Sequence, residues 1–141
     1  MTDLNLKSTQ STPSIYAVAG VGKLEMRGDS NPENSFEFFK PIVGWMENFL
    51  NSESTPFALE LHLLYLNTSS VKAVMDIFDL LEEAHADGRE VSVQWFYDQE
   101  NSRIVELAEE FKEDCFFPFE IIGSDSSNLL LKLFVFEVIC F

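Results

Sequence analysis

Residues 57–66, FALELHLLYL, begin with alternating apolar and polar side chains and end as an almost continuous apolar run. Such a pattern is typical of a central strand of a sheet. The next residues, NTSS at 67–70, are all types that cap helices, and apolar side chains then recur at helical spacing as far as Leu81. Gly88 is placed to end that helix. We therefore expect a buried strand that leads directly into a helix over residues 69–86.

The segment before this strand predicts a β-hairpin. Residues 15–19 and 23–27 are short runs of strand-forming side chains, and they flank the turn GVG at 20–22. A loop of this length that contains glycine joins two antiparallel strands.

A helix is predicted between the hairpin and the central strand. Ser30 or Asn31 provides an N-cap, with Pro32 in the first turn. Apolar side chains over residues 38–50 recur every three or four positions, which indicates one broad buried face. Pro41 removes a backbone hydrogen bond within this region and predicts a kink or a late helix start.

The remaining elements complete an alternating pattern. Residues 91–97 predict a strand, residues 104–111 an amphipathic helix and residues 117–122 another strand. The order is thus ββαβαβαβ. Because strands that alternate with helices require crossover connections, we expect a single α/β (or α+β) domain, with a mixed sheet and helices packed on it.

The two ends of the chain differ from the middle. Residues 1–14 are rich in Ser and Thr and predict a loosely docked, flexible arm, so the domain is expected to cover residues 15–123. Residues 124–141 form an apolar tail that predicts an extra edge strand or a partner contact. Its apolar run is shorter than the roughly 20 residues that a membrane-spanning helix needs.

Composition excludes two classes of partner. The 141 residues include 9 Lys and Arg against 24 Asp and Glu, a formal net charge of −15, and 46% are hydrophobic. This apolar content suits one folded core, whereas an acidic surface repels nucleic-acid phosphates and anionic lipid head groups. Cys115 and Cys140 are too few for a disulfide framework, and no signal-peptide pattern is seen. We therefore expect a cytoplasmic protein with no nucleic acid and no membrane as partner.

Candidate catalytic and metal-binding residues are few. His62 lies in the middle of an expected strand and His85 near the end of an expected helix, with no Cys or His at metal-ligand spacing. Cys115 follows Asp114, an acidic neighbour that raises a thiol pKa and disfavours a nucleophilic thiolate. The sequence therefore predicts a protein that is not an enzyme and holds no cofactor and no metal ion.

Thr68 is the one residue for which the sequence favours a specific chemistry. Its hydroxyl ends an apolar strand and starts a helix, so it is expected at the carboxyl edge of the sheet, where α/β folds place functional loops. In one interpretation Asn67, Thr68 and Ser69 only cap the helix. In the other Thr68 is phosphorylated, because a phosphate there meets free helix N–H groups and Lys72, four residues on.

Several blocks of the sequence resemble the SiaC family of bacterial regulatory phosphoproteins. They are GDSNPENS at 28–35, LYLNTSS at 64–70, MDIFDLLEEAH at 75–85, ELAEEF at 106–111, EDC at 113–115 and PF at 118–119. The resemblance spans roughly residues 8–122. The family is similar to the anti-sigma-factor antagonist (STAS) fold, which implies a phosphorylated Ser or Thr after a central strand.

The resemblance implies a threonine switch, and its motif assigns the switch to Thr68. It implies a SiaB-type kinase that phosphorylates this residue, a SiaA-type PP2C-like phosphatase, and a SiaD-type diguanylate cyclase that the unmodified protein binds and activates. The cyclase product, cyclic di-GMP, favours biofilm formation. Asn67, Ser69, Ser70 and Lys72 are expected as exposed partner contacts because they lie close to Thr68 in the sequence.

Three other hypotheses are open at this point. A STAS-like anti-sigma-factor antagonist acts by sequestering a partner instead of activating a cyclase. A small hydrolase requires two carboxylates with separated pKa values that face one cleft. A structural homo-oligomer requires that the apolar tail at 124–141 joins copies of the chain.

Overall fold

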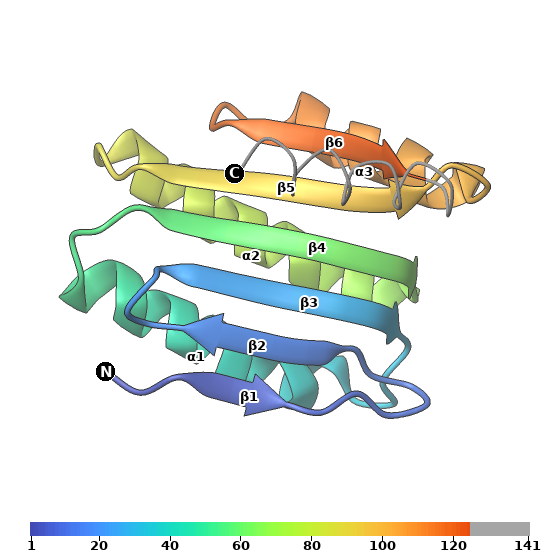
Figure 1. Ribbon diagram of the computed structural model, residues 1–141, viewed down its shortest axis with the longest axis horizontal. Coiled ribbons are helices and arrows are strands. Elements are labelled where there is room, and N and C mark those ends of the chain that lie inside the picture. The colour runs from blue at the N-terminus through green and yellow to red at the C-terminus, as the bar shows by residue number, and fades with distance from the viewer. Residues whose placement is uncertain (125–141) are drawn as a thin grey trace, which may run out of the picture.

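The computed structural model describes residues 1–124 as one mixed sheet with helices packed on it, which confirms the predicted fold class (Figure 1). The elements are, in chain order, β1 (Leu4–Leu6), β2 (Ser14–Val18), β3 (Lys23–Ser30), α1 (Ser35–Ser52), β4 (Phe57–Leu66), α2 (Thr68–Ala86), β5 (Val91–Asp98), α3 (Ser102–Glu113) and β6 (Phe119–Ser124). From β2 onward this is the order expected from the sequence. Apart from Ser124, the predicted apolar tail, with its possible edge strand, lies outside the described residues.

β4 lies in the middle of the sheet, as predicted for residues 57–66. The strand order is β1-β2-β3-β4-β5-β6, and β4 pairs in parallel with β3 on one side and with β5 on the other. β5 and β6 are also parallel, whereas β2 pairs antiparallel with both β1 and β3. The predicted hairpin is therefore confirmed as β2 and β3. Gly22 in its turn has a φ of 74°, a conformation that favours glycine.

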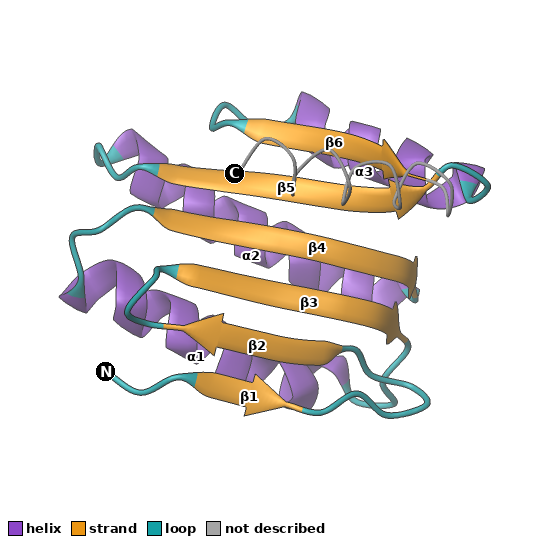
Figure 2. Cartoon of the chain, viewed as in Figure 1, coloured by secondary structure: helices purple, strands orange, loops and turns teal. Residues whose placement is uncertain are grey.

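All three helices within residues 1–124 lie on one face of the sheet (Figure 2). Each helix connects two neighbouring parallel strands, and such crossovers are almost always right-handed. Because β3, β4, β5 and β6 follow one another across the sheet, crossovers of one hand put every helix on the same side. The helices and strands enclose one apolar core, whose largest fully buried side chains include Trp95, Phe49, Phe57, Ile15 and Leu24.

The opposite face of the sheet carries no helix within residues 1–124 and is lined by ion pairs. Lys23 and Arg27 of β3 each pair with both Glu25 and Glu60, at N–O distances of 3.2–3.6 Å. A hydrogen bond with the Glu60 side chain, helped by the two cations and opposed by burial, lowers the pKa of Glu25 to about 2. This network therefore favours the ionised form of the Glu25 carboxyl.

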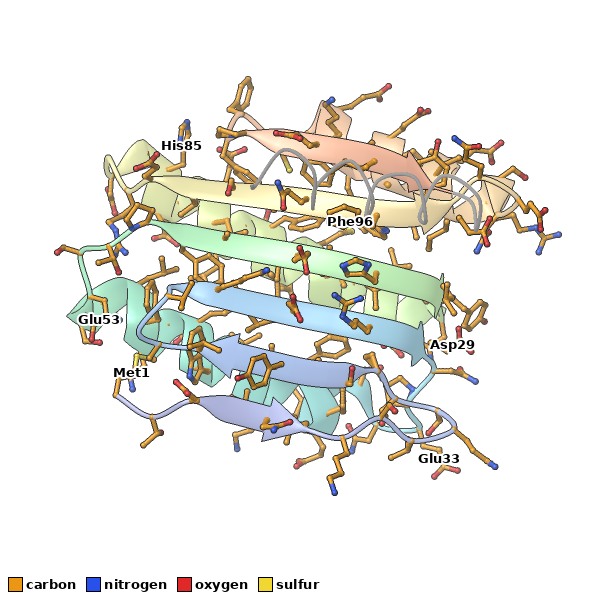
Figure 3. The ribbon with its side chains drawn as sticks, in the orientation of Figure 1. Met1, Asp29, Glu33, Glu53, His85 and Phe96 are labelled. Carbon is orange, nitrogen blue, oxygen red and sulfur yellow. The ribbon has the colours of Figure 1, made fainter. Side chains whose placement is uncertain are left out.

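His62 lies on this helix-free face, as predicted for a sheet-face residue. Its ring stacks on the ring of Phe96, with 4.5 Å between centroids, and Figure 3 shows Phe96 on the side of β5 away from the helices. Burial lowers the pKa of His62, although the interaction with Glu60 opposes the shift. Burial therefore favours the neutral form of this imidazole.

The N-terminal segment differs from the prediction of a loosely docked arm, because residues 4–6 form the edge strand β1. Leu4 and Leu6 are partly buried and pack against the core. Two hydrogen bonds tie the segment further: Trp45 Nε1 donates to the carbonyl of Thr2 (2.8 Å), and Ala19 N–H donates to Asp3 Oδ1 (2.9 Å). Three residues are too short a run to show a period of two in the sequence.

The start of α1 also differs from the sequence prediction, which placed the N-cap at Ser30 or Asn31. Ser30 instead ends β3, where it pairs with Leu66 of β4, and Asn34 is the N-cap. The helix therefore begins late, at Ser35, and Pro41 lies inside it. The cap prediction was wrong because pairing with β4 keeps the chain extended for longer than local sequence indicates.

Candidate functional site

Three helices begin at one edge of the sheet, where the parallel strands β3, β4 and β5 end. Figure 3 shows Asp29 and Glu33 at this edge. The three helices have the same type of N-cap, an asparagine whose side-chain oxygen accepts a hydrogen bond from a backbone N–H: Asn34, Asn67 and Asn101. The carboxyl edge therefore gathers three helix N-termini, each with a positive dipole end.

Asn67, the N-cap of α2, also joins α2 to the loop that follows β3. Its Oδ1 accepts from Ser70 N–H (2.9 Å), which caps the helix. Its Nδ2 donates to Asn31 Oδ1 (3.0 Å) and to the carbonyl of Pro32 (3.3 Å), and its backbone N–H donates to the carbonyl of Ser30 (2.9 Å). This half-buried side chain therefore fixes the start of α2 against the end of β3 and the loop that leads into α1.

Thr68 is the first residue of α2 and is exposed. Because Asn67 is the N-cap, the Thr68 hydroxyl is not needed to cap the helix, and no hydrogen bond holds it among residues 1–124. The first backbone N–H groups of a helix lack partners within the helix, and here they belong to Thr68 and Ser69. Lys72, one turn further along α2, is exposed as well. The hydroxyl thus lies free on the surface, beside free N–H donors and within a turn of a cation.

Ser69 and Ser70 hold α2 to its neighbours. Ser69 Oγ lies 2.6 Å from Ser35 Oγ of α1 and also donates to Asn67 Oδ1 (3.3 Å). Ser70 Oγ lies 2.7 Å from Ser30 Oγ and donates to the Ser30 carbonyl (3.2 Å). Ser70 is fully buried, which corrects the expectation that it is exposed. The inward position follows from the helical period, since Ser70 shares the face of Val74.

A groove of about 530 Å³ runs between α1 and α2 beside this site. Its α1 side is formed by Ser35, Phe36, Phe39, Lys40, Val43, Gly44 and Glu47, and its α2 side by Ser69, Lys72, Ala73 and Asp76. None of the residues on the α1 side was predicted from the sequence as part of the site. The available signal was Phe36, an apolar ring in the first turn of α1 that lies outside the buried period and is 71% exposed.

The other candidates have no comparable geometry. Among the described residues, no three His, Cys, Asp or Glu side chains converge as a metal-binding group. Burial raises the pKa of the Cys115 thiol to about 11, with further contributions from Glu82 and Asp114, in the direction that the sequence predicted. None of the helices in residues 1–124 combines the length and apolarity that crossing a bilayer requires.

Comparison with known proteins gives one consistent family. The model of SiaC family regulatory phosphoproteins matches residues 6–124. An uncharacterized protein of Pseudomonas aeruginosa strain UCBPP-PA14 is 57% identical over 125 residues, which make up 89% of this chain and 99% of that protein.

The fold is similar to that of solved SiaC structures, whose sequence identity to this chain is close to that of the relative above. SiaC of Pseudomonas aeruginosa matches with a TM-score of 0.84 and 56% identity, over 88% of this chain and 100% of that chain. A crystal structure of the diguanylate cyclase SiaD in complex with its activator SiaC, from the same organism, also matches, with a TM-score of 0.84 and 56% identity over 86% of this chain and 100% of that chain. On the family match, the sequence identity and the shared fold, the chain belongs to the SiaC family of regulatory phosphoproteins.

Proposed function

We propose that this chain is a non-enzymatic cytoplasmic switch protein that binds and activates a diguanylate cyclase when Thr68 is unmodified. A SiaB-type kinase phosphorylates Thr68 and ends binding, and a SiaA-type PP2C-like phosphatase restores it. The observation that carries the proposal is the free, exposed hydroxyl of Thr68 at the first position of α2. The relative that is solved with SiaD as its activator supports the choice of a cyclase as partner.

The start of α2 can accept a phosphate without unfolding. A phosphate on Thr68 adds about −1.5 to −2 charges at pH 7, next to helix N–H groups and the positive end of the dipole. Lys72 lies one turn on, the spacing at which side chains on a helix meet. The modification is therefore tolerated locally, while it changes the charge and the shape of the surface that a partner meets.

Only a small change in free energy is needed to operate such a switch. A tenfold change in affinity corresponds to about 1.4 kcal/mol. Leaving one hydrogen-bonded group of the interface buried without a partner costs about 1–3 kcal/mol. One displaced contact beside Thr68 is therefore enough to turn binding off.

The test compares Thr68→Asp with Thr68→Ala for binding to the purified cyclase by calorimetry. We expect the carboxylate to weaken binding at least tenfold and Thr68→Ala to keep it. Ser102→Asp is the matched control, because it adds the same charge at the first residue of α3. Equal affinity of Thr68→Asp and Thr68→Ala would contradict the proposal, and so would capture of a sigma-factor regulator in place of a cyclase.

A further inference from the structure

The groove between α1 and α2 has a fixed register, because Ser35 and Ser69 join its two walls. Their hydroxyl oxygens lie 2.6 Å apart, at the first residue of α1 and the second of α2. Both helices follow parallel strands and run in the same direction away from this bridge. Positions along the groove can therefore be compared by their distance from the bridge, at about 1.5 Å per residue.

Charges of opposite sign lie at different depths along this groove. The cations Lys40 and Lys72 come first, at about 7.5 and 4.5 Å from the bridge at helical rise. The carboxylates Asp76 and Glu47 follow, at about 10.5 and 18 Å. The cationic end is also the end nearest Thr68, the first residue of α2.

Apolar side chains line the groove alongside these charges. Phe39 and Val43 belong to the apolar side of α1, and Ala73 faces them from α2. Gly44 widens the groove, since a Cβ built there meets nothing within 4 Å. Phe36 stands at the cationic end with 71% of its surface exposed, and Lys40 Nζ lies 6.0 Å from its ring centroid. An exposed aromatic ring at the mouth of an apolar groove is typical of a protein interface.

We propose that this groove is the docking site for one amphipathic helix of the cyclase partner. The helix presents an apolar stripe to the groove, an acidic side chain to Lys40 and Lys72, and a basic side chain to Asp76 and Glu47. This inference rests on the proposed function and adds to it the surface and the chemistry of the partner. Helices that bind in grooves insert apolar side chains at helical spacing, and here the order of charges fixes their direction.

The geometry favours a helix over a small molecule. Small-molecule sites combine an apolar lining with a few polar groups that converge in a deep cavity. The charged side chains of this groove are instead exposed residues spread along two helices. The buried serine of the groove, Ser35, is already hydrogen-bonded to Ser69. An elongated surface with charges at its rim matches a helix in shape.

The groove and the switch share residues, which explains how phosphorylation of Thr68 affects binding of the partner. Ser69 and Lys72 line the groove and also flank Thr68. A phosphate on Thr68 attracts Lys72 and repels the acidic side chain that the partner places at this end. Phosphorylation therefore removes a favourable charge contact and adds an unfavourable one at the same position.

The first test fills the groove without disturbing the core. Gly44→Trp places a large side chain into the open space, and we expect it to weaken cyclase binding at least tenfold. Gly20→Trp is the matched control, because a Cβ at Gly20 also meets nothing within 4 Å and this residue lies in the β2–β3 turn, away from the groove. Normal cyclase binding by folded Gly44→Trp would overturn the proposal.

A second variant covers the case in which Gly44→Trp misfolds. Asp76→Lys reverses a charge on an exposed side chain, and we expect a several-fold loss of affinity that becomes smaller at high salt. Affinity that is unchanged at low salt would contradict the assigned charge order.

Sedimentation of each variant tests whether a second copy of this chain, and not the cyclase, occupies the groove. Loss of self-association without loss of cyclase binding would overturn the proposal.

Thr68→Asp measured in parallel separates this inference from the proposed function. If Thr68→Asp weakens binding while both groove variants bind normally, the switch stands and the docking site is wrong. If the unmodified chain does not bind the cyclase at all, the proposed function fails, and the docking site fails with it.

Discussion

The first turns of α2 and α3 begin alike and differ in what surrounds their first hydroxyl. Each helix has an Asn N-cap that accepts from a backbone N–H, at 2.9 Å for Asn67 and 3.3 Å for Asn101. Each cap is followed by an exposed hydroxyl residue, Thr68 or Ser102. Capping chemistry and exposure are therefore common to both sites and do not by themselves make a switch.

The two helix starts differ in the charge that lies one turn further on and in the surface that each start borders. Four residues after Thr68 stands Lys72, whereas four residues after Ser102 stands Glu106. A phosphate meets an opposite charge in α2 and a like charge in α3. In addition, of the α2 and α3 starts only that of α2 borders the groove between α1 and α2. The neighbours of a helix start, and not the helix start itself, therefore favour Thr68 over Ser102 as the switch.

The largest expected effect is the choice of phosphorylation site. We expect the partner kinase and ATP to place phosphate on Thr68 and to leave Ser102 unmodified, because Glu106 repels a phosphate on Ser102. Peptide mass spectrometry measures the occupancy of each site. Thr68→Ala removes the modification and Ser102→Ala does not. Similar occupancy at both residues would break the contrast between the two helix starts.

The two caps are expected to differ in their contribution to stability. Asn67→Ala removes a cap, worth about 1 kcal/mol, and two side-chain hydrogen bonds to the loop before α1, so we expect a loss of about 2 kcal/mol. Asn101→Ala removes a longer cap bond and one bond to the Leu64 carbonyl, and we expect about 1 kcal/mol. Urea unfolding of both variants gives the two free energies. A larger loss for Asn101→Ala than for Asn67→Ala would contradict the prediction that Asn67 contributes more to stability.

Much of the fold follows from local sequence, and the groove does not. The bounds of β4 match the predicted strand because no turn residue interrupts its pattern from Phe57 to Leu66, and Thr68 was selected as the candidate because capping residues follow that strand directly. The start of α1 was predicted too early because Ser30 is kept extended by pairing with Leu66. The groove needs α1 beside α2, a contact between residues far apart in the chain, and single-sequence periodicity carries no information about it.

A smaller effect on the free energy of unfolding is expected at acid pH. It comes from the helix-free face of the sheet and not from the helix starts. The pKa of Glu25 is about 2 in the folded chain against 4.5 for the ordinary group. The ionised Glu25 carboxyl therefore contributes to the free energy of unfolding above pH 4.5, and this contribution is lost as the pH falls from there towards 2. We expect a loss of about 1 kcal/mol after allowance for solvent screening. Glu25→Gln should flatten this part of the pH profile, and an unchanged profile would contradict the assignment to Glu25.

The smallest expected effect concerns the cation one turn after Thr68. In the phosphorylated chain, Lys72→Gln should lower the free energy of unfolding by about 0.5 kcal/mol, the size of one such pair on a helix surface. In the unphosphorylated chain the same change should have no measurable effect. Thermal unfolding of the four proteins measures the difference. Equal effects in both states would show that Lys72 does not meet the phosphate.

We propose that phosphate on Thr68 controls cyclase binding, and a titration that compares the two forms of the chain tests this proposal. The chain is phosphorylated completely on Thr68, separated from the unmodified form, and each form is titrated into the purified cyclase by calorimetry. We predict that the unmodified form binds at least ten times more tightly and that phosphatase treatment restores the lost affinity. Equal affinity of the two forms would contradict the account.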